Sequence, residues 1–150
     1  MCPAGWVKLD KGLFGDSLED NMTNDSPRIL YVDTETDQRI LLAAMLEYRG
    51  FNVSTAKRAL DALQLIATEH FHVVIVDYEL PDMTGAQLAQ EIRAAEPSAR
   101  VILFSGRPHL PAGELAYIDV HIVKGSLLDT IIETIRGLLQ PPNLTPEPVA

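Results

Sequence analysis

The sequence contains a single cysteine, Cys2, and this scarcity excludes an intrachain disulfide. A thiol so close to the N-terminus is also a poor nucleophile for a fixed site. No run of about 18 apolar residues is present, so no segment is predicted to span a bilayer. The first residues lack the basic start and continuous apolar stretch of a secretory signal. We therefore expect a cytoplasmic location.

Positive charge is also scarce, with 12 lysines and arginines against 21 aspartates and glutamates and a formal net charge of -9. Direct nucleic-acid binding usually needs a basic patch, so this balance argues against it. The same balance disfavours docking on an anionic membrane surface. What the chain does contain is 150 residues, 47% of them hydrophobic. That length and composition predict one globular domain with a substantial core.

The two ends of the chain differ in composition from its middle. Residues 1–27 contain scattered glycines, and positions 16–25 carry four acidic residues with little that is apolar. We predict a flexible N-terminal leader there, with a small apolar group that includes Trp6 and Phe14. Residues 140–150 hold four prolines and predict a proline-rich C-terminal tail. The folded domain is expected over residues 28–139.

Short apolar runs alternate with helical patterns inside this domain. The runs that predict strands lie at 29–32, 52–55, 73–76, 100–104 and 121–123. The first helical pattern, at 37–49, stops at Gly50, a good helix terminator. Its apolar residues at helical spacing are Ile40, Leu41, Ala44, Met45 and Tyr48.

Strands that are apolar on both faces and separated by helices indicate a parallel sheet covered on both sides. The predicted fold class is α/β, a doubly wound, flavodoxin-like sheet of five parallel strands in the order 2-1-3-4-5. Pro108, Pro111 and Gly113 interrupt the segment between the fourth and fifth strands. We therefore expect the helix there to be shortened or irregular.

Polar residues stand at the ends of four of the predicted strands. Asp33, Asp77, Ser105 and Lys124 follow the first, third, fourth and fifth strands. A parallel sheet brings strand ends to one edge, where ligands bind in doubly wound folds. Carboxylate and carbonyl oxygens suit Mg²⁺, which binds through one or two carboxylates plus a phosphate. Hydroxyl and ammonium groups are suited to hold the remaining phosphoryl oxygens.

The region 28–139 resembles a CheY-like receiver domain of two-component response regulators. The run Val-Asp-Tyr-Glu-Leu-Pro-Asp-Met-Thr-Gly at 76–85 matches the receiver pattern of a phosphoacceptor aspartate followed by the proline and glycine of its loop. Asp33, Ser105 and Lys124 then fall on the acidic, hydroxyl and lysine positions of the family, in the right order.

The resemblance implies a role for each of these residues. Asp77 would accept a phosphoryl group from a sensor histidine kinase or a phosphotransfer protein. Asp33, Asp77 and the main-chain carbonyl of Glu79 would hold Mg²⁺. Ser105 would bind the phosphoryl group and act as a switch, and Lys124 would pair with it. The resemblance thus implies a single-domain switch protein that signals through contacts with an unknown downstream protein. It implies no enzyme activity beyond self-catalysed phosphorylation and dephosphorylation.

Three positions depart from the family pattern. Thr34 stands where receivers usually carry a second acid, so we expect weakened Mg²⁺ binding, which the neighbouring Glu35 would partly offset. Gly125 replaces the usual proline after Lys124, so a cis peptide is not expected there. His121 occupies the switch position that is usually aromatic, and its titration would add a pH response; the alternative is a partly exposed polar residue on an edge strand.

Glu79 and Arg107 occupy positions that tune dephosphorylation in receivers. Our hypothesis is that they pair across the mouth of the site and obstruct water, and an unchanged phosphoryl half-life in Glu79→Ala would contradict it. Two other functions stay open. One is a pseudo-receiver binding module, with Thr34 as the sign that metal-dependent phosphorylation has been lost. The other is an aspartyl phosphatase with Asp33 as its nucleophile. Oligomeric state is left undecided.

Overall fold

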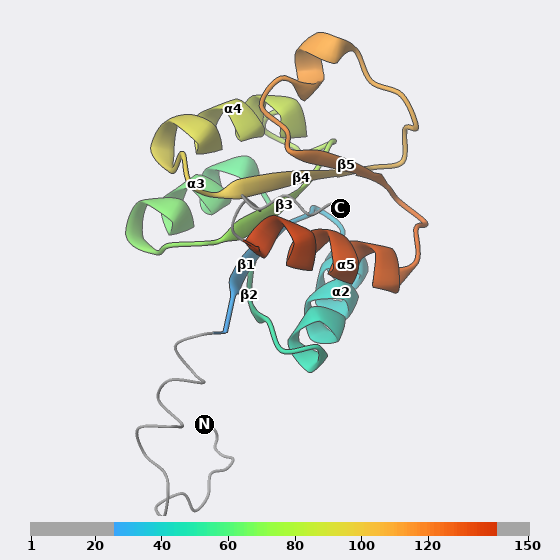
Figure 1. The fold of residues 1–150 in the computed structure, drawn as a ribbon. Coiled ribbons are helices and arrows are strands. Elements are labelled where there is room, and N and C mark those ends of the chain that lie inside the picture. Colours follow the sequence, from blue (N-terminus) through green and yellow to red (C-terminus); the bar gives the residue numbers. More distant parts are fainter. Residues whose placement is uncertain (1–25, 141–150) are drawn as a thin grey trace, which may run out of the picture.

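The computed structural model describes residues 26–140, which form a five-stranded parallel sheet covered by helices on both faces (Figure 1). The strand order β2-β1-β3-β4-β5 is the predicted one, so the doubly wound fold class is confirmed. The strands are β1 (Arg28–Val32), β2 (Asn52–Ala56), β3 (Val73–Asp77), β4 (Arg100–Ser105) and β5 (Val120–Val123). The helices are α2 (Thr36–Tyr48), α3 (Ala59–Thr68), α4 (Gly85–Ala95), α5 (Leu128–Leu139) and the short 3-10 helix η1 (Ala112–Leu115).

Two apolar cores lie on opposite faces of the sheet. Because side chains alternate along a strand, Leu30 and Val32 of β1 enter one core while Ile29 and Tyr31 enter the other. Helices α3 and α4 cover the first core, and α2 and α5 cover the second, as Figure 1 shows. Every residue of β3 is buried, which is typical of a central strand in a parallel sheet.

Helix α2 buries a different face from the one that its apolar spacing indicated. Leu42 and Leu46 are its buried residues, whereas all five members of the predicted stripe are exposed. The exposed fraction is 57% for Leu41 and 88% for Tyr48. The apolar residues run around most of this helix, so their spacing alone could not identify the inward side. The prediction of the helix was correct, and its large exposed apolar residues are Ile40, Leu41, Met45 and Tyr48.

The segment between β4 and β5 contains only η1, so the expected shortened helix is confirmed. Arg93 of α4 anchors this segment, since its guanidinium donates to a carboxylate oxygen of Asp119 at 2.8 Å. The same Asp119 oxygen accepts the main-chain N–H of Val101 at 2.7 Å. The connection is therefore fixed at its C-terminal end, directly before β5.

The predicted leader and tail lie almost wholly outside the described residues. Positions 1–25 and 141–150 are not part of the described structure, so the boundaries at 27 and 140 stay predictions. Within residues 26–140, no helix combines the length and the apolar character needed to cross a membrane.

Candidate functional site

Four polar residues meet at the carboxyl edge of the sheet. Asp33 follows β1, Asp77 ends β3, Ser105 ends β4 and Lys124 follows β5. Asp33 is fully buried, and Asp77 and Ser105 are nearly so. Buried carboxylates are costly unless they are paired, so their presence at one edge calls for compensating groups.

Lys124 supplies the main compensation. Its ammonium lies 3.0 Å from Asp77 Oδ1 and 3.6 Å from Asp33 Oδ2, so a single cation bridges both carboxylates. The ammonium also lies 5.7 Å from the centroid of the Phe104 ring, on β4 below it. One positive charge against two buried negative charges leaves this edge with a local excess of negative charge. Such an excess favours a further cation.

The charge state of the site follows from this imbalance. Burial raises the pKa of Asp77, and the negative charge of Asp33 adds to the effect, while the hydrogen bond from Lys124 opposes it. Burial by itself would lower the pKa of Lys124, but the hydrogen bond to Asp77 and the charge of Asp33 raise that pKa overall. The raised pKa keeps Lys124 protonated as an ammonium. A positively charged ligand would stabilise the ionised form of Asp77.

Asp33 is held at both of its carboxylate oxygens. The hydroxyl of Tyr31 donates to Oδ2 at 2.6 Å, and the main-chain N–H of Glu35 donates to Oδ1 at 2.9 Å. Burial and the bond to Asp33 raise the pKa of Tyr31. Sequence reasoning missed Tyr31; the available signal was a phenol in an apolar strand, two residues before an acid and hence on the same face.

Ser105 is oriented by the loop that follows β4. Its Oγ accepts the main-chain N–H of Arg107 at 2.9 Å, and its carbonyl accepts the N–H of Lys124 at 2.7 Å. These bonds tie the β4 end to the β5 end. The hydroxyl therefore faces the same pocket as the Asp77 carboxylate.

The pocket above the sheet edge has a volume of about 420 Å³ and is lined by Thr34, Glu35, Asp77, Tyr78, Glu79, Ser105, Gly106, Arg107 and Lys124. Arg107 Nη2 lies 3.5 Å from Glu79 Oε2, and both side chains are largely exposed. The Arg107 guanidinium also lies 5.2 Å from the centroid of the Tyr78 ring. The predicted pair is therefore present at the mouth, and its effect on hydrolysis stays a prediction.

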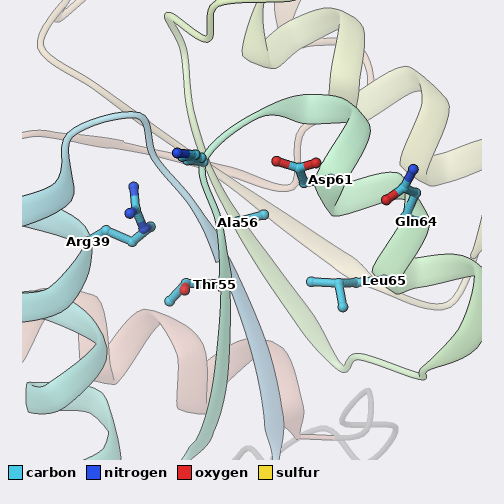
Figure 2. Close-up of a pocket in the computed structure, with 7 residues that line it drawn as sticks. Arg39, Thr55, Ala56, Asp61, Gln64 and Leu65 are labelled. Carbon is cyan, nitrogen blue, oxygen red and sulfur yellow. The ribbon is translucent and has the colours of Figure 1, made fainter.

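Thr34, where a second acid was expected, lies against the β2–α3 connection. Its hydroxyl donates to the carbonyl of Lys57 at 3.3 Å. Arg39 of α2 fixes the loop between β1 and α2, since its guanidinium donates to the carbonyl of Asp33 at 2.8 Å. Figure 2 shows Arg39 reaching from α2 toward this loop, beside a second pocket of about 420 Å³ between α2, β2 and α3.

The loop after Asp77 is shaped by Gly85, the first residue of α4. A Cβ atom at this position would lie 2.5 Å from the carbonyl oxygen of Asp77, so only glycine fits. Thr84 caps α4 in a reciprocal capping box with Gln87. This explains why a Thr-Gly pair ends the 76–85 run. The helix starts in direct contact with the strand that carries Asp77.

His121 lies on β5, opposite Leu103 of β4, on the face away from Ile122. Its Nε2 is buried and is the one buried side-chain nitrogen or oxygen without a hydrogen-bond partner within residues 26–140. The residue is thus half-buried on an edge strand, so the switch role and the partly exposed polar residue both stay open. Gly125 after Lys124 has a φ of 98°, and the described residues contain no cis peptide bond.

The donor set fits Mg²⁺ better than a transition metal. No group of three or more histidine, cysteine, aspartate or glutamate side chains in the described region is placed to hold a metal ion. Mg²⁺ does not need such a group, because it retains water and binds through one or two carboxylates. Asp33 and Asp77, bridged by one ammonium, match that requirement.

Comparison with known proteins places this geometry in a family. The model of the response regulator receiver domain matches residues 29–136, and the chain belongs to this family. A receiver domain is a signalling switch and not a classical enzyme, which agrees with the sequence-based expectation. The site residues named above lie within the matched region.

Curated relatives include the probable transcriptional regulatory protein TcrX of Mycobacterium tuberculosis, 27% identical over 120 residues, which cover 78% of this chain and 51% of TcrX. PrrA of the same organism is 28% identical, with 77% and 51% covered. The chain thus spans about half the length of these relatives.

Among solved structures, the response regulator TrrA of Thermotoga maritima, in complex with Mg²⁺-BeF, has a TM-score of 0.71 and 32% identity, with 75% of this chain and 99% of TrrA covered. TrrA is also known in complex with the histidine kinase ThkA; that match has a TM-score of 0.71 and 31% identity, with 76% and 99% covered.

Proposed function

We propose that this chain is a phosphorylatable receiver whose phosphoacceptor is Asp77. The observation that carries the proposal is the ammonium of Lys124 bridging Asp77 and Asp33 at 3.0 and 3.6 Å at the edge of a pocket. Ser105 and the pocket volume provide room and a hydroxyl for phosphoryl oxygens. The donor would be a histidine kinase or a phosphotransfer protein, by analogy with TrrA and its kinase.

The transfer itself asks for positioning and charge neutralisation. An oxygen of Asp77 attacks the phosphorus of a phosphohistidine, so that an O–P bond forms while the N–P bond breaks. The electron pair of that bond returns to the imidazole nitrogen, which takes up a proton from solvent. Lys124 and the Ser105 hydroxyl hold phosphoryl oxygens. Asp33, Asp77 and the carbonyl of Glu79 would hold Mg²⁺, which supplies positive charge against the phosphoryl oxygens.

A pseudo-receiver that binds partners without phosphorylation is the second candidate. Thr34 favours it, because this position offers a neutral hydroxyl bonded to Lys57 where a carboxylate would strengthen the metal site. The retained trio of Asp77, Ser105 and Lys124 favours the first candidate. Nothing in the described pocket supports a substrate cap of the kind that an aspartyl phosphatase needs.

Intact mass after incubation with acetyl phosphate and Mg²⁺ separates these candidates. We expect one phosphoryl adduct, absent from Asp77→Asn and retained in Asp61→Asn, a matched change on α3 at a side chain that is 33% exposed. Wild-type protein without an adduct would support the pseudo-receiver. Repeated turnover that requires Asp33 would support the phosphatase.

The phosphodonor would dock on the apolar face of α2. This face, made of Ile40, Leu41, Met45 and Tyr48, is exposed, and α2 begins beside the pocket-lining residues Thr34 and Glu35. Two hollows continue it toward α5, with Leu41 and Met45 in one and Met45 and Tyr48 in the other. An apolar face next to the site suits a helical partner that must bring its histidine to Asp77.

The domain organisation belongs to the same proposal. We expect residues 28–139 to act as the receiver, with 1–27 as a leader and 140–150 as a tail. Output would pass through protein contacts, with Ser105 and His121 as the residues that change position.

A further inference from the structure

The phenol of Tyr31 has an unusual place for a core tyrosine. Its side chain is fully buried at the centre of the sheet, where β1 pairs with β2 on one side and β3 on the other. Its ring meets the ring of Phe104 edge-on, with centroids 6.5 Å apart. Because Tyr31 and Asp33 are two residues apart in an extended segment, both side chains project to the same face. The hydroxyl thus reaches Asp33 Oδ2 at 2.6 Å.

This bond completes a clamp on one carboxylate. Tyr31 holds Oδ2, the N–H of Glu35 holds Oδ1, and Arg39 holds the carbonyl of the same aspartate. A carboxylate has about four lone-pair positions. The two neutral donors and the Lys124 ammonium, 3.6 Å from Oδ2, therefore leave acceptor capacity for a further cation. The clamp therefore fixes the orientation of Asp33 without exhausting it as a ligand.

The need for such a clamp comes from the neighbouring position. Thr34 donates its hydroxyl to Lys57 and offers no carboxylate. The exposed Glu35 is the nearest further acid on this loop, whereas Asp33 is fully buried. With one buried acid in the place of two, cation affinity depends more strongly on how well that acid is oriented.

We propose that Tyr31 is a positioning residue that orients Asp33 for a divalent cation and offsets the acid missing at Thr34. The inference rests on the proposed function, because it takes Asp33 as a cation ligand. It assigns Tyr31 no contact with the phosphoryl group. The chemical class of ligand is a hard divalent cation such as Mg²⁺.

The structural alternative is that Asp33 only satisfies a buried phenol, since buried tyrosines normally find a partner for their hydroxyl. The substitution Tyr31→Phe distinguishes the two. A purely structural bond would leave cation affinity unchanged after the hydroxyl is removed. A positioning bond would lower that affinity, because partners behind a metal ligand typically contribute about 10–100-fold.

The experiment is calorimetric titration of the full chain with MgCl₂, alongside urea unfolding without Mg²⁺. We expect Tyr31→Phe to weaken Mg²⁺ binding by about 10-fold or more. Tyr117→Phe, which removes a hydroxyl from a partly exposed tyrosine away from Asp33, should bind Mg²⁺ as the wild type does. Equal affinity in Tyr31→Phe and wild type would overturn the proposal.

A second variant tests the compensation directly. Thr34→Asp restores a carboxylate, so the loss caused by Tyr31→Phe should shrink when both changes are combined. A loss of equal size in the Thr34→Asp background would overturn the compensating role.

A third measurement does not depend on the folding of Tyr31→Phe. In wild-type protein with ¹³C at tyrosine Cζ, the Tyr31 resonance should shift in step with Mg²⁺ saturation, and an unmoved resonance would overturn the proposal. The affinity for Mg²⁺ is measured without phosphorylation. A missing adduct at Asp77 would therefore reject the proposed function, whereas the role of Tyr31 is decided by the Mg²⁺ titration alone.

Discussion

His72 shows at the scale of one residue how a side chain outside the site affects stability. Its Nδ1 accepts the main-chain N–H of Arg28 at 3.0 Å, at the start of β1. Only a ring that is unprotonated at Nδ1 can accept this bond. Partial burial lowers the pKa of His72, and the neighbouring His70 ring, 5.0 Å away, adds to the effect.

The pH dependence of unfolding follows from this lowered pKa. Below the ordinary histidine pKa, near 6.5, the unfolded chain takes up a proton that the folded chain resists, so the free energy of unfolding falls as pH falls. The ring is largely exposed, which keeps the effect small. We expect urea unfolding between pH 7 and 5 to show a smaller decline in His72→Asn, which keeps an acceptor without titrating in this range.

His109→Asn is the matched control, because His109 lies exposed in the β4–η1 connection. It should preserve the wild-type decline. Identical pH profiles for wild type and His72→Asn would contradict the assignment.

At the scale of an element, the loop after Asp77 caps the N-terminus of helix α3. Its N-cap position, Arg58, provides no side-chain cap. The carboxylate of Asp82 replaces it from the β3–α4 loop, with Oδ1 accepting the N–H of Ala59 and Oδ2 that of Leu60, both at 2.9 Å. Negative charge at a helix N-terminus is also favoured by the helix dipole.

Loss of this cap should destabilise the domain measurably. We expect Asp82→Ala to lower the free energy of unfolding by about 1 kcal/mol, the usual contribution of an N-terminal cap. Asp61→Ala on the same helix removes only an exposed pair with Arg58 and should cost less, about 0–1 kcal/mol. Urea denaturation of both variants measures the difference, and an Asp82→Ala midpoint at or above that of Asp61→Ala would refute the cap.

Local patterns predicted these elements well, but contacts between distant segments escaped them. The strands follow from short apolar runs, and α2 follows from a helical pattern that stops at Gly50. The Asp82 cap joins residues more than twenty positions apart, so no local pattern announces it. The Tyr31 clamp was missed for a different reason, since the strand reads simply as apolar. The buried face of α2 could not be predicted, because it depends on how the helix packs against the sheet.

At the scale of the whole described domain, residues 26–140, two apolar cores are covered and one large apolar helix face is not. The two cores on the faces of the sheet are closed by helices, whereas the α2 face of Ile40, Leu41, Met45 and Tyr48 has no covering element within residues 26–140. Figure 1 shows α2 and α5 side by side on this side of the sheet. The strand-end residues could be predicted to meet because topology alone brings them together. The helix face that stays exposed could not be predicted from the sequence, because it depends on packing.

If the α2 face docks the phosphodonor, a substitution on it should affect phosphorylation by a protein donor and not phosphorylation by acetyl phosphate. Leu41→Asp should reduce the rate of transfer from a phosphorylated kinase or phosphotransfer protein at least 10-fold, because it places a charge in an apolar interface. Phosphorylation by acetyl phosphate, which needs no docking, should be unchanged. Leu60→Asp, a similarly exposed leucine on α3, is the control. Equal loss with both donors would assign Leu41 to the fold and not to docking.

The glycines around the site differ in how closely their surroundings are packed. A Cβ added at Gly85, the first residue of α4, would lie within 3 Å of Asp77, Tyr78 and Leu103, so the packing there leaves no free space. Gly106 and Gly125, directly after Ser105 and Lys124, have no atom within 4 Å of an added Cβ. A side chain at position 85 would therefore collide with the end of β3, whereas the space beside Gly106 and Gly125 is open. The site thus has room to accept bulk next to β4 and β5, the strands that carry the hydroxyl, the ammonium and His121, and none next to α4.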